Sequence, residues 1–313
     1  MGKNVSKSSL ARANQDRDYH IFEEYAYYLV SEARQKCANH IFKLGGNVYA
    51  FDSTTIDLCL SVFWWAKFRK KKGGIKVHTL YDVETQIPAF FHITEASVHD
   101  SKVMIEIPYE PSSYYIFDRG YNNFKILYKI HQIEAYFVVR AKKNLGYKSI
   151  QWKRRLPKNV LSDASVFLTG FYPKQYYPEP LRLVKYWDEE QEREFTFITN
   201  AMHISALQVA ELYKNRWQVE LFFKWLKQHL KIKRFWGTTE NAVRIQIYAA
   251  ICAYCLVAII QHDMQLNRST YEVLQILSIS LTDKTHLRDL FDKTKFQNDK
   301  ERFGPNGPSL FNF

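Results

Sequence analysis

The chain has 313 residues, of which 46% are hydrophobic, so it can bury one large core or two modest ones without disulfide bonds. Its net charge is +12 at pH 7, and three segments hold more than all of this charge: 67–76, 140–158 and 207–236. Cations focused in this way are typical of a protein that binds a polyanion such as nucleic acid, whereas charge kept for solubility is dispersed and mixed in sign.

Secretion and membrane insertion are not expected from the sequence. The cysteines show no disulfide-framework spacing, and no charged start leads into an apolar leader. The longest apolar run, residues 247–260, suits a buried helix better than a membrane span. We therefore expect a cytoplasmic protein with no membrane partner.

Taken in chain order, the first 45 residues show capped helical patterns. Strand-like runs follow at 48–51, 55–60, 75–81 and 87–94, the last two joined by a turn at 82–86. An apolar run at 114–117, a helical pattern at 123–132 and a buried strand at 135–139 then give the order strand, helix, strand. This order favours an α/β fold.

The second half of the chain changes in composition. Residues 141–199 are basic and rich in tyrosine and proline, with strand-like pieces at 165–168, 181–187 and 195–199, so we interpret them as a β-rich insertion. A long helix is predicted from Ser205, whose spacing to Gln208 fits a capping box, to about residue 231. A second, apolar helix covers about 241–262, and the tail from residue 282 is predicted to be irregular.

Two aspartates share a local setting that favours metal binding. Asp52 and Asp118 each follow an apolar, strand-like run. Carboxylates on neighbouring strand ends can share divalent cations, because Mg²⁺ prefers oxygen ligands and leaves positions for water and phosphate. For either residue alone, a simple capping role is the better interpretation.

The long predicted helix supplies the third carboxylate. At about 100° per residue, one face carries Glu220 among basic and tyrosine side chains, and the opposite face is apolar. A single Glu next to two cations is ordinarily an exposed ion pair, but a continuous basic row repels itself unless a polyanion lies on it. The remaining members of the row are Tyr213, Arg216, Lys224, Lys227, Lys231 and Arg234, which we predict to bind DNA.

Weaker candidates leave alternatives open. His99 and Asp100 either support the carboxylates from nearby or form an ordinary turn. Four tryptophans, Trp64, Trp65, Trp217 and Trp236, could stack on bases, although most tryptophans belong to protein cores.

Several of these motifs together resemble a known family. The spacing Tyr213-x2-Arg216-x3-Glu220-x6-Lys227 matches the Y-(2)-R-(3)-E-(6)-K motif of the IS4 family of insertion-sequence transposases. Two further segments resemble the family's other catalytic motifs, Phe-Asp-Ser-Thr at 51–54 and Phe-Asp-Arg-Gly-Tyr at 117–121. The similarity runs from about residue 4 to the C-terminus.

This resemblance implies an RNase H-like α/β fold, a mixed five-stranded sheet with flanking helices and a β-rich insertion before the last catalytic helix. The expected domains are a helical remnant of an N-terminal DNA-binding region (1–45), the catalytic core in two parts (46–140 and 200–281), the insertion (141–199) and the tail (282–313). The family ordinarily begins with a DNA-binding domain, which this chain is expected to lack.

By the same resemblance, Asp52, Asp118 and Glu220 are the catalytic residues and hold two Mg²⁺ ions, with Mn²⁺ as a substitute. The implied reaction is cleavage and strand transfer of DNA, through a hairpin on the excised end, by a nucleoid-associated homodimer on double-stranded transposon ends and target. Two alternatives remain open at this stage, namely a stand-alone RNase H-like nuclease and a catalytically impaired DNA-binding fragment.

Overall fold

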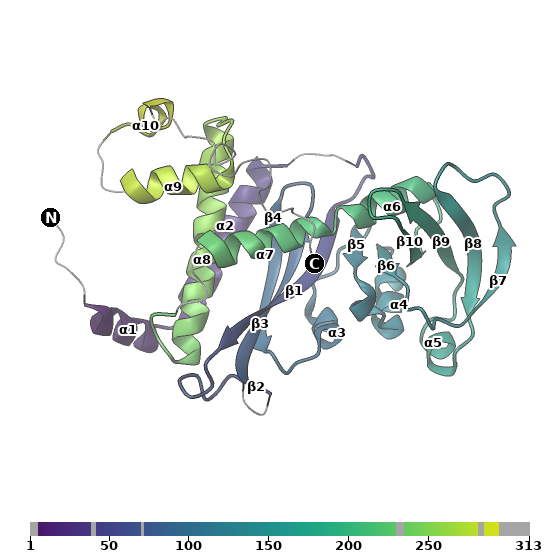
Figure 1. Ribbon diagram of the computed structural model, residues 1–313, viewed down its shortest axis with the longest axis horizontal. Helices are drawn as coiled ribbons and strands as arrows, with labels where there is room; N and C mark the ends of the chain where they lie inside the picture. The colour runs from purple at the N-terminus through teal and green to yellow at the C-terminus, as the bar shows by residue number, and fades with distance from the viewer. Residues whose placement is uncertain (1–5, 39–41, 70–71, 230–234, 281–284, 294–313) are drawn as a thin grey trace.

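The computed structural model describes residues 6–38, 42–69, 72–229, 235–280 and 285–293. Within these residues, ten strands form one sheet (Figure 1). The strands are β1 (Val48–Leu58), β2 (Lys67–Arg69), β3 (Lys72–Asp82), β4 (Ile87–Glu95), β5 (Tyr114–Phe117), β6 (Tyr136–Arg140), β7 (Tyr147–Trp152), β8 (Val160–Leu168), β9 (Leu181–Asp188) and β10 (Arg193–Thr199).

The described residues also form helices. They are α1 (Lys7–Asp16), α2 (Tyr19–Lys36), α3 (Asp100–Val103), α4 (Phe124–Gln132), α5 (Phe171–Tyr176), α6 (Ala206–Lys214), α7 (Trp217–His229), α8 (Glu240–Asp263), α9 (Thr270–Ser280) and α10 (Leu287–Lys293). Two short 3-10 turns, η1 (Met104–Glu106) and η2 (Arg119–Tyr121), follow α3 and β5.

Five neighbouring strands, in the order β4-β3-β1-β5-β6, make the central part of the sheet. The β1, β3 and β4 strands form an antiparallel meander, whereas β5 and β6 run parallel to β1. Parallel neighbours need a crossover, and α4 supplies it between β5 and β6. This mixed sheet with helices on both faces confirms the expected RNase H-like class.

The sheet does not stop at five strands, which corrects the expected size. The β10 strand pairs antiparallel with β6, and β9, β8 and β7 follow in order, so the strands of the insertion extend the central sheet. Figure 1 shows them at the right of the molecule. The β6 strand would otherwise be an edge with unpaired backbone groups, and pairing with β10 satisfies them.

Two hydrophobic cores lie on opposite faces of the sheet. One contains residues of α2, α6, α7 and α8, including Leu29, Phe222 and Ile251. The other contains residues of η1 and α4, including Met104 and Leu127. Figure 1 shows α7 lying across β1 and β3, which places one end of α7 over the middle of the sheet.

The α8 helix matches the apolar helix predicted at about 241–262. It is long and apolar enough to cross a membrane by length and composition alone. However, 56% of its most apolar 18-residue window is buried inside the protein, as in a core helix.

Other details differ from the sequence predictions. The runs at 48–51 and 55–60 belong to one strand, because Ser53 and Thr54 pair with β3 without a break. The tail from residue 282 is not wholly irregular, because α10 forms where Phe291 is buried against Val273 and Ile276 of α9. The β7 strand and α5 were not predicted at all.

Candidate active site

Asp52 and Asp118 come together through the pairing of two parallel strands. The register pairs Phe51 of β1 with Phe117 of β5. The residue after each phenylalanine is an aspartate, so Asp52 and Asp118 lie on neighbouring backbone segments that are about 5 Å apart. Asp118 directly follows β5, as predicted, whereas Asp52 lies within the long β1 strand.

Glu220 reaches the same place from a helix that is shorter than predicted. The Ser205 capping box is confirmed, but the predicted long helix is wrong, because α6 ends at Lys214 and α7 begins at Trp217. Asn215 lies at the break, where its side chain donates to the Glu211 carbonyl and accepts from Gln218. Asparagine competes with helical hydrogen bonds in this way and favours helix ends.

The helix break changes the geometry of the predicted row. Tyr213 belongs to α6, Arg216 lies in the connecting turn, and Glu220 is in the first turn of α7. The three residues therefore belong to two helices and the turn between them instead of to one helical face.

Direct contacts join these residues into one cluster. Arg216 donates from Nη1 to Oδ2 of Asp52 at 2.8 Å and from Nη2 to Oε1 of Glu220 at 2.5 Å. The Tyr213 hydroxyl donates to Oδ1 of Asp118 at 2.7 Å. Of the five residues, Tyr213 is buried and the Glu220 side chain is 54% exposed, so the cluster opens to solvent on the Glu220 side.

The electrostatics of the two aspartates differ. Burial raises the pKa of Asp52 to about 6 against the opposing effect of Arg216, and the nearby carboxylates of Glu220 and Asp118 raise it further. Burial also acts to raise the pKa of Asp118, but the hydrogen bond from Tyr213 and the charges of Arg216 and Arg140 outweigh it, so this pKa is lowered. Asp52 is therefore the carboxylate whose pKa the other two acids affect.

Arg216 is the main counter-charge in the cluster. Burial opposes its charge, but Asp52 and Glu220 favour it more strongly, so the pKa of Arg216 is raised. Among the described residues, no three acidic, histidine or cysteine side chains stand at metal-binding spacing. The guanidinium of Arg216 lies between two of the predicted ligands instead.

A second group of side chains contacts Asp52 and the adjacent Ser53. Oγ of the adjacent Ser53 donates to Asp100 at 2.9 Å, and Nζ of Lys76 lies 3.0 Å from the same carboxylate oxygen. The Tyr121 hydroxyl donates to Asp52 at 3.4 Å. Asp100 therefore supports the strand that carries Asp52, which was one of the two interpretations of His99 and Asp100. His99 has a local structural role instead, as the N-cap of α3.

Arg140 is a site residue that sequence reasoning missed. It ends β6, next to β5 and Asp118, and its charge lowers the pKa of Asp118. Its guanidinium also stacks on Phe195, 4.9 Å from the ring centroid. The sequence contained a usable signal, because the carboxyl ends of parallel strands are where sites of α/β sheets gather.

The remaining lysines of the predicted row are placed as follows. Lys224 is exposed on α7. Nζ of Lys227 donates to the carbonyl of Thr55 on β1 at 2.9 Å, so α7 touches β1 beyond the Asp52 contact. Lys231 and Arg234 lie outside the described residues.

Comparison with known proteins agrees with the motifs. The family described as "Transposase DDE domain" matches residues 43–256. The transposase y4zB of Sinorhizobium fredii is 37% identical over 246 residues, 76% of this chain and 67% of the relative.

Two further relatives belong to named insertion sequences. The IS5377 transposase of Geobacillus stearothermophilus is 27% identical over 80% of this chain and 66% of its own length. The IS4SA transposase of Synechocystis is 25% identical over 90% of this chain and 80% of its own length. The chain thus spans about two thirds or more of each of these three relatives.

Among solved structures, the piggyBac transposase in a synaptic complex with hairpin DNA aligns with a TM-score of 0.46. It is 13% identical, and the alignment covers 83% of this chain and 58% of the other, a similarity too distant to carry an argument. The family match covers well over half of the chain and agrees with the motifs around the three carboxylates. This chain therefore belongs to the DDE transposases, and it is of the IS4 type.

Proposed function

We propose that this chain catalyses metal-dependent cleavage and strand transfer of an insertion sequence, with Asp52, Asp118 and Glu220 as the catalytic residues. Enzymes of the family cleave and transfer DNA strands, so DNA is the partner. The observation that carries the residue assignment is the cluster itself: Arg216 contacts both Asp52 and Glu220, and Asp118 follows the strand beside Asp52. Burial, with smaller contributions from Glu220 and Asp118, also raises the pKa of Asp52. Strongly perturbed acids that share an open cluster mark functional sites more often than structural ones.

The carboxylates suit a divalent cation in their chemistry. Asp52, Asp118 and Glu220 offer only oxygen ligands, which Mg²⁺ and Mn²⁺ prefer. A cation would favour the charged form of Asp52, whose pKa is raised by burial and, to a smaller extent, by Glu220 and Asp118. We assign these three residues as its ligands, with two ions in the complete site. Such ions, when bound, stabilise the attacking and leaving oxygens of a displacement at phosphorus.

The protein's own residues bind and orient the phosphate. Arg216 uses two of its five N–H groups on Asp52 and Glu220, and the planar guanidinium matches the geometry of a phosphate as well as that of a carboxylate. Tyr213 keeps the Asp118 carboxylate ionised and fixed through its hydrogen bond. Lys227 lies at the β1 side of α7, where its charge attracts the next phosphate of the strand.

The proposed DNA path continues along the basic residues. Lys224 is exposed for a backbone contact, and Lys231 and Arg234 are assigned the same role from the sequence alone. We assign residues 46–140 and 200–281 to the catalytic core and 141–199 to the insertion. The two ends of an element must be handled together, so we propose a homodimer on DNA, in the cytoplasm at the nucleoid.

The reaction that this assignment supports is phosphoryl transfer in two steps. A water oxygen bonds to phosphorus and the bond to the 3′-oxygen breaks, which leaves a 3′-hydroxyl. That hydroxyl then attacks a phosphodiester of target DNA, whose own 3′-oxygen departs. The second step separates a transposase from a simple nuclease.

The test uses duplex DNA that carries the inverted repeats flanking the gene. We expect wild-type protein to nick this DNA with Mg²⁺ but not with EDTA, and to join the cut ends to a plasmid. Glu220→Gln should lose both activities by at least about 100-fold with an unchanged circular dichroism spectrum. Glu194→Gln, at an exposed acid of β10, serves as the matched control and should keep them. Cleavage by Glu220→Gln at the wild-type rate would contradict the assignment.

A further inference from the structure

Two adjacent loops each expose a tryptophan to solvent. Trp64 lies between β1 and β2 and is 73% exposed, and Trp236 lies between α7 and α8 and is 65% exposed. Both are far more exposed than an apolar side chain of this size ordinarily is in a folded protein. Neither belongs to the site described above.

A small aromatic contact holds the two loops together. The rings of Phe63 and Phe235, the residues that precede the two tryptophans, meet edge to face with centroids 6.0 Å apart. Phe63 also contacts Trp65, whose Nε1 donates to the carbonyl of Thr238 at 2.8 Å. The backbone N–H of Trp236 donates to Gln246 of α8. The loops are therefore fixed on both sides.

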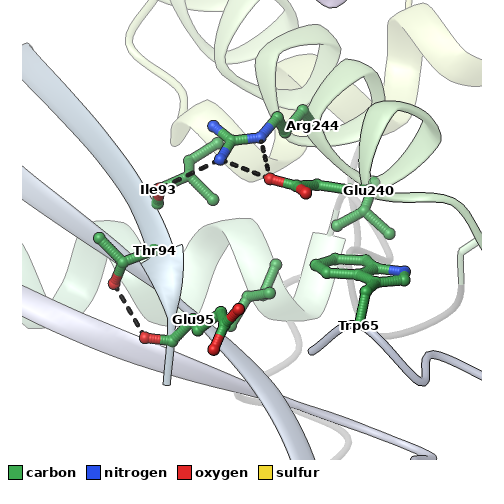
Figure 2. Close-up of a pocket in the computed structure, with 8 residues that line it drawn as sticks. Trp65, Ile93, Thr94, Glu95, Glu240 and Arg244 are labelled. Atoms are coloured by element: carbon green, nitrogen blue, oxygen red, sulfur yellow. Dashed lines mark hydrogen bonds and ion pairs between the residues drawn. The ribbon is translucent and has the colours of Figure 1, made fainter. Parts of the chain in front are cut away.

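Buried and exposed side chains alternate along each loop, which explains why the indoles of Trp64 and Trp236 project into solvent. Phe63 is buried and Trp65 is half-buried, so Trp64 between them points away from the core. Figure 2 shows Trp65 beside a small pocket that Glu240 and Arg244 also line. Phe235 likewise packs against the core while Trp236 does not. We call Trp64 and Trp236 the tryptophan pair.

The tryptophan pair lies downstream of the carboxylates along β1. From Asp52 the strand continues to Leu58, six residues or about 20 Å further, and the Trp64 loop follows. Two contacts join this part of the chain to β1: Arg216, in the turn before α7, contacts Asp52, and Lys227 of α7 contacts Thr55, three residues further along β1. A DNA strand that leaves the carboxylates along α7 therefore arrives at the tryptophan pair.

Charge and chemistry select the occupant. The segment 67–76, which follows Trp64, holds six basic residues and no acid. A phosphate backbone suits these cations, but it offers nothing to an indole face. Bases inside a duplex are already stacked on one another, whereas an unpaired base presents a free face to an aromatic ring.

We propose that the tryptophan pair, which lies beyond the Leu58 end of β1, is a stacking surface for unpaired bases of the DNA strand. This inference rests on the proposed function for the direction of the DNA, but it makes a separate claim about binding. The pair binds single-stranded DNA through base stacking.

The experiment compares two DNA probes by fluorescence anisotropy in EDTA, where no cleavage occurs. One is a blunt duplex, and the other is the same duplex with a single-stranded tail, tested at either end. We expect wild-type protein to prefer a tailed duplex. The Trp64→Ala/Trp236→Ala variant should lose about five-fold or more of its affinity for that probe and little for the blunt one. Tyr28→Ala, at an exposed aromatic of α2, is the matched control and should bind as wild type.

Three results would overturn the proposal: equal affinity of wild type and double variant for tailed DNA, an equal loss on both probes, or a weaker self-association in sedimentation with unchanged DNA binding. The last result would make the pair a contact between copies of the chain. Because the measurement needs no metal, it can succeed when the cleavage assay fails. Trp64→Phe/Trp236→Phe keeps an aromatic face at both positions and should retain most of the preference.

Discussion

Two aspartate–arginine pairs lie in different regions of the sheet, and their surroundings differ in kind. In the insertion, Arg182 of β9 donates two hydrogen bonds of 2.7 and 2.8 Å to Asp163 of β8, and both side chains are at most 3% exposed. In the catalytic cluster, Arg216 donates to Asp52 from Nη1 alone and to Glu220 from Nη2.

The pKa values report the difference. Burial acts to raise the pKa of Asp163, but hydrogen bonds from Arg182 and Lys153 outweigh it, so this pKa is lowered. The pKa of Asp52 is raised to about 6 because burial and two further acids outweigh one shared arginine. The same two residue types thus form a structural ion pair in one region, where the charge of Asp163 is fully compensated. In the other region they form a cluster in which the charge of Asp52 is not.

The largest expected effect is on the structural pair. Asp163→Asn leaves the buried guanidinium of Arg182 without its counter-charge, so we expect the free energy of unfolding to fall by about 3–5 kcal/mol. Arg182 also donates to the carbonyls of Ala201 and Ile204 before α6, and the loss should therefore loosen the start of that helix. Urea denaturation followed by circular dichroism measures the change. A loss below about 1 kcal/mol, the level expected for the exposed control Glu194→Gln, would show that the comparison is wrong.

A smaller effect, of opposite sign, is expected at the cluster. In metal-free buffer the folded protein holds a proton on Asp52 up to about pH 6, whereas the unfolded chain releases it near pH 4, so wild-type stability falls as the pH rises through this interval. Asp52→Asn cannot titrate. The free energy of unfolding of the variant, relative to that of wild type, should therefore increase as the pH rises from 4 to 7, by at most roughly 3 kcal/mol.

The structural pair gives the reverse pH dependence. The lowered pKa of Asp163 means that its contribution is fully present above the unfolded value near pH 4 and is lost as the pH falls through the folded value. Urea denaturation at several pH values separates the two cases. A stability gap between Asp52→Asn and wild type that does not change from pH 4 to pH 7 would mean that Asp52 is as well compensated as Asp163.

The comparison also explains how much of the site the sequence could predict. Asp52, Asp118 and Glu220 were proposed from local patterns, two after apolar strand-like runs and one on an amphipathic helix, together with the resemblance to the motifs of the IS4 family. Arg140 was missed because its place beside Asp118 depends on the pairing of β5 with β6, and its position at the end of a predicted strand was the only local sign of it. The same reason hid the pairing of β10 with β6, so the sheet was predicted too small.

The break between α6 and α7 was missed for a different reason. The helical periodicity continues across Asn215, and a single asparagine within such a pattern is a weak sign of a helix end. As a result, Arg216, which contacts both Asp52 and Glu220, lies in a turn and not within a helix. Local propensity thus predicted the residues of the row but not that they belong to two helices and the turn between them.

Binding of Mn²⁺ tests the central claim most directly, because Asp52, Asp118 and Glu220 are assigned as the ligands of one metal site. Electron paramagnetic resonance can measure the affinity of the full chain in the presence of DNA. We predict that Asp52→Asn, Asp118→Asn and Glu220→Gln each weaken binding by at least about tenfold, because each removes a charged ligand, and that Glu194→Gln leaves the affinity unchanged. Equal Mn²⁺ affinity for wild type and all three variants would contradict the account.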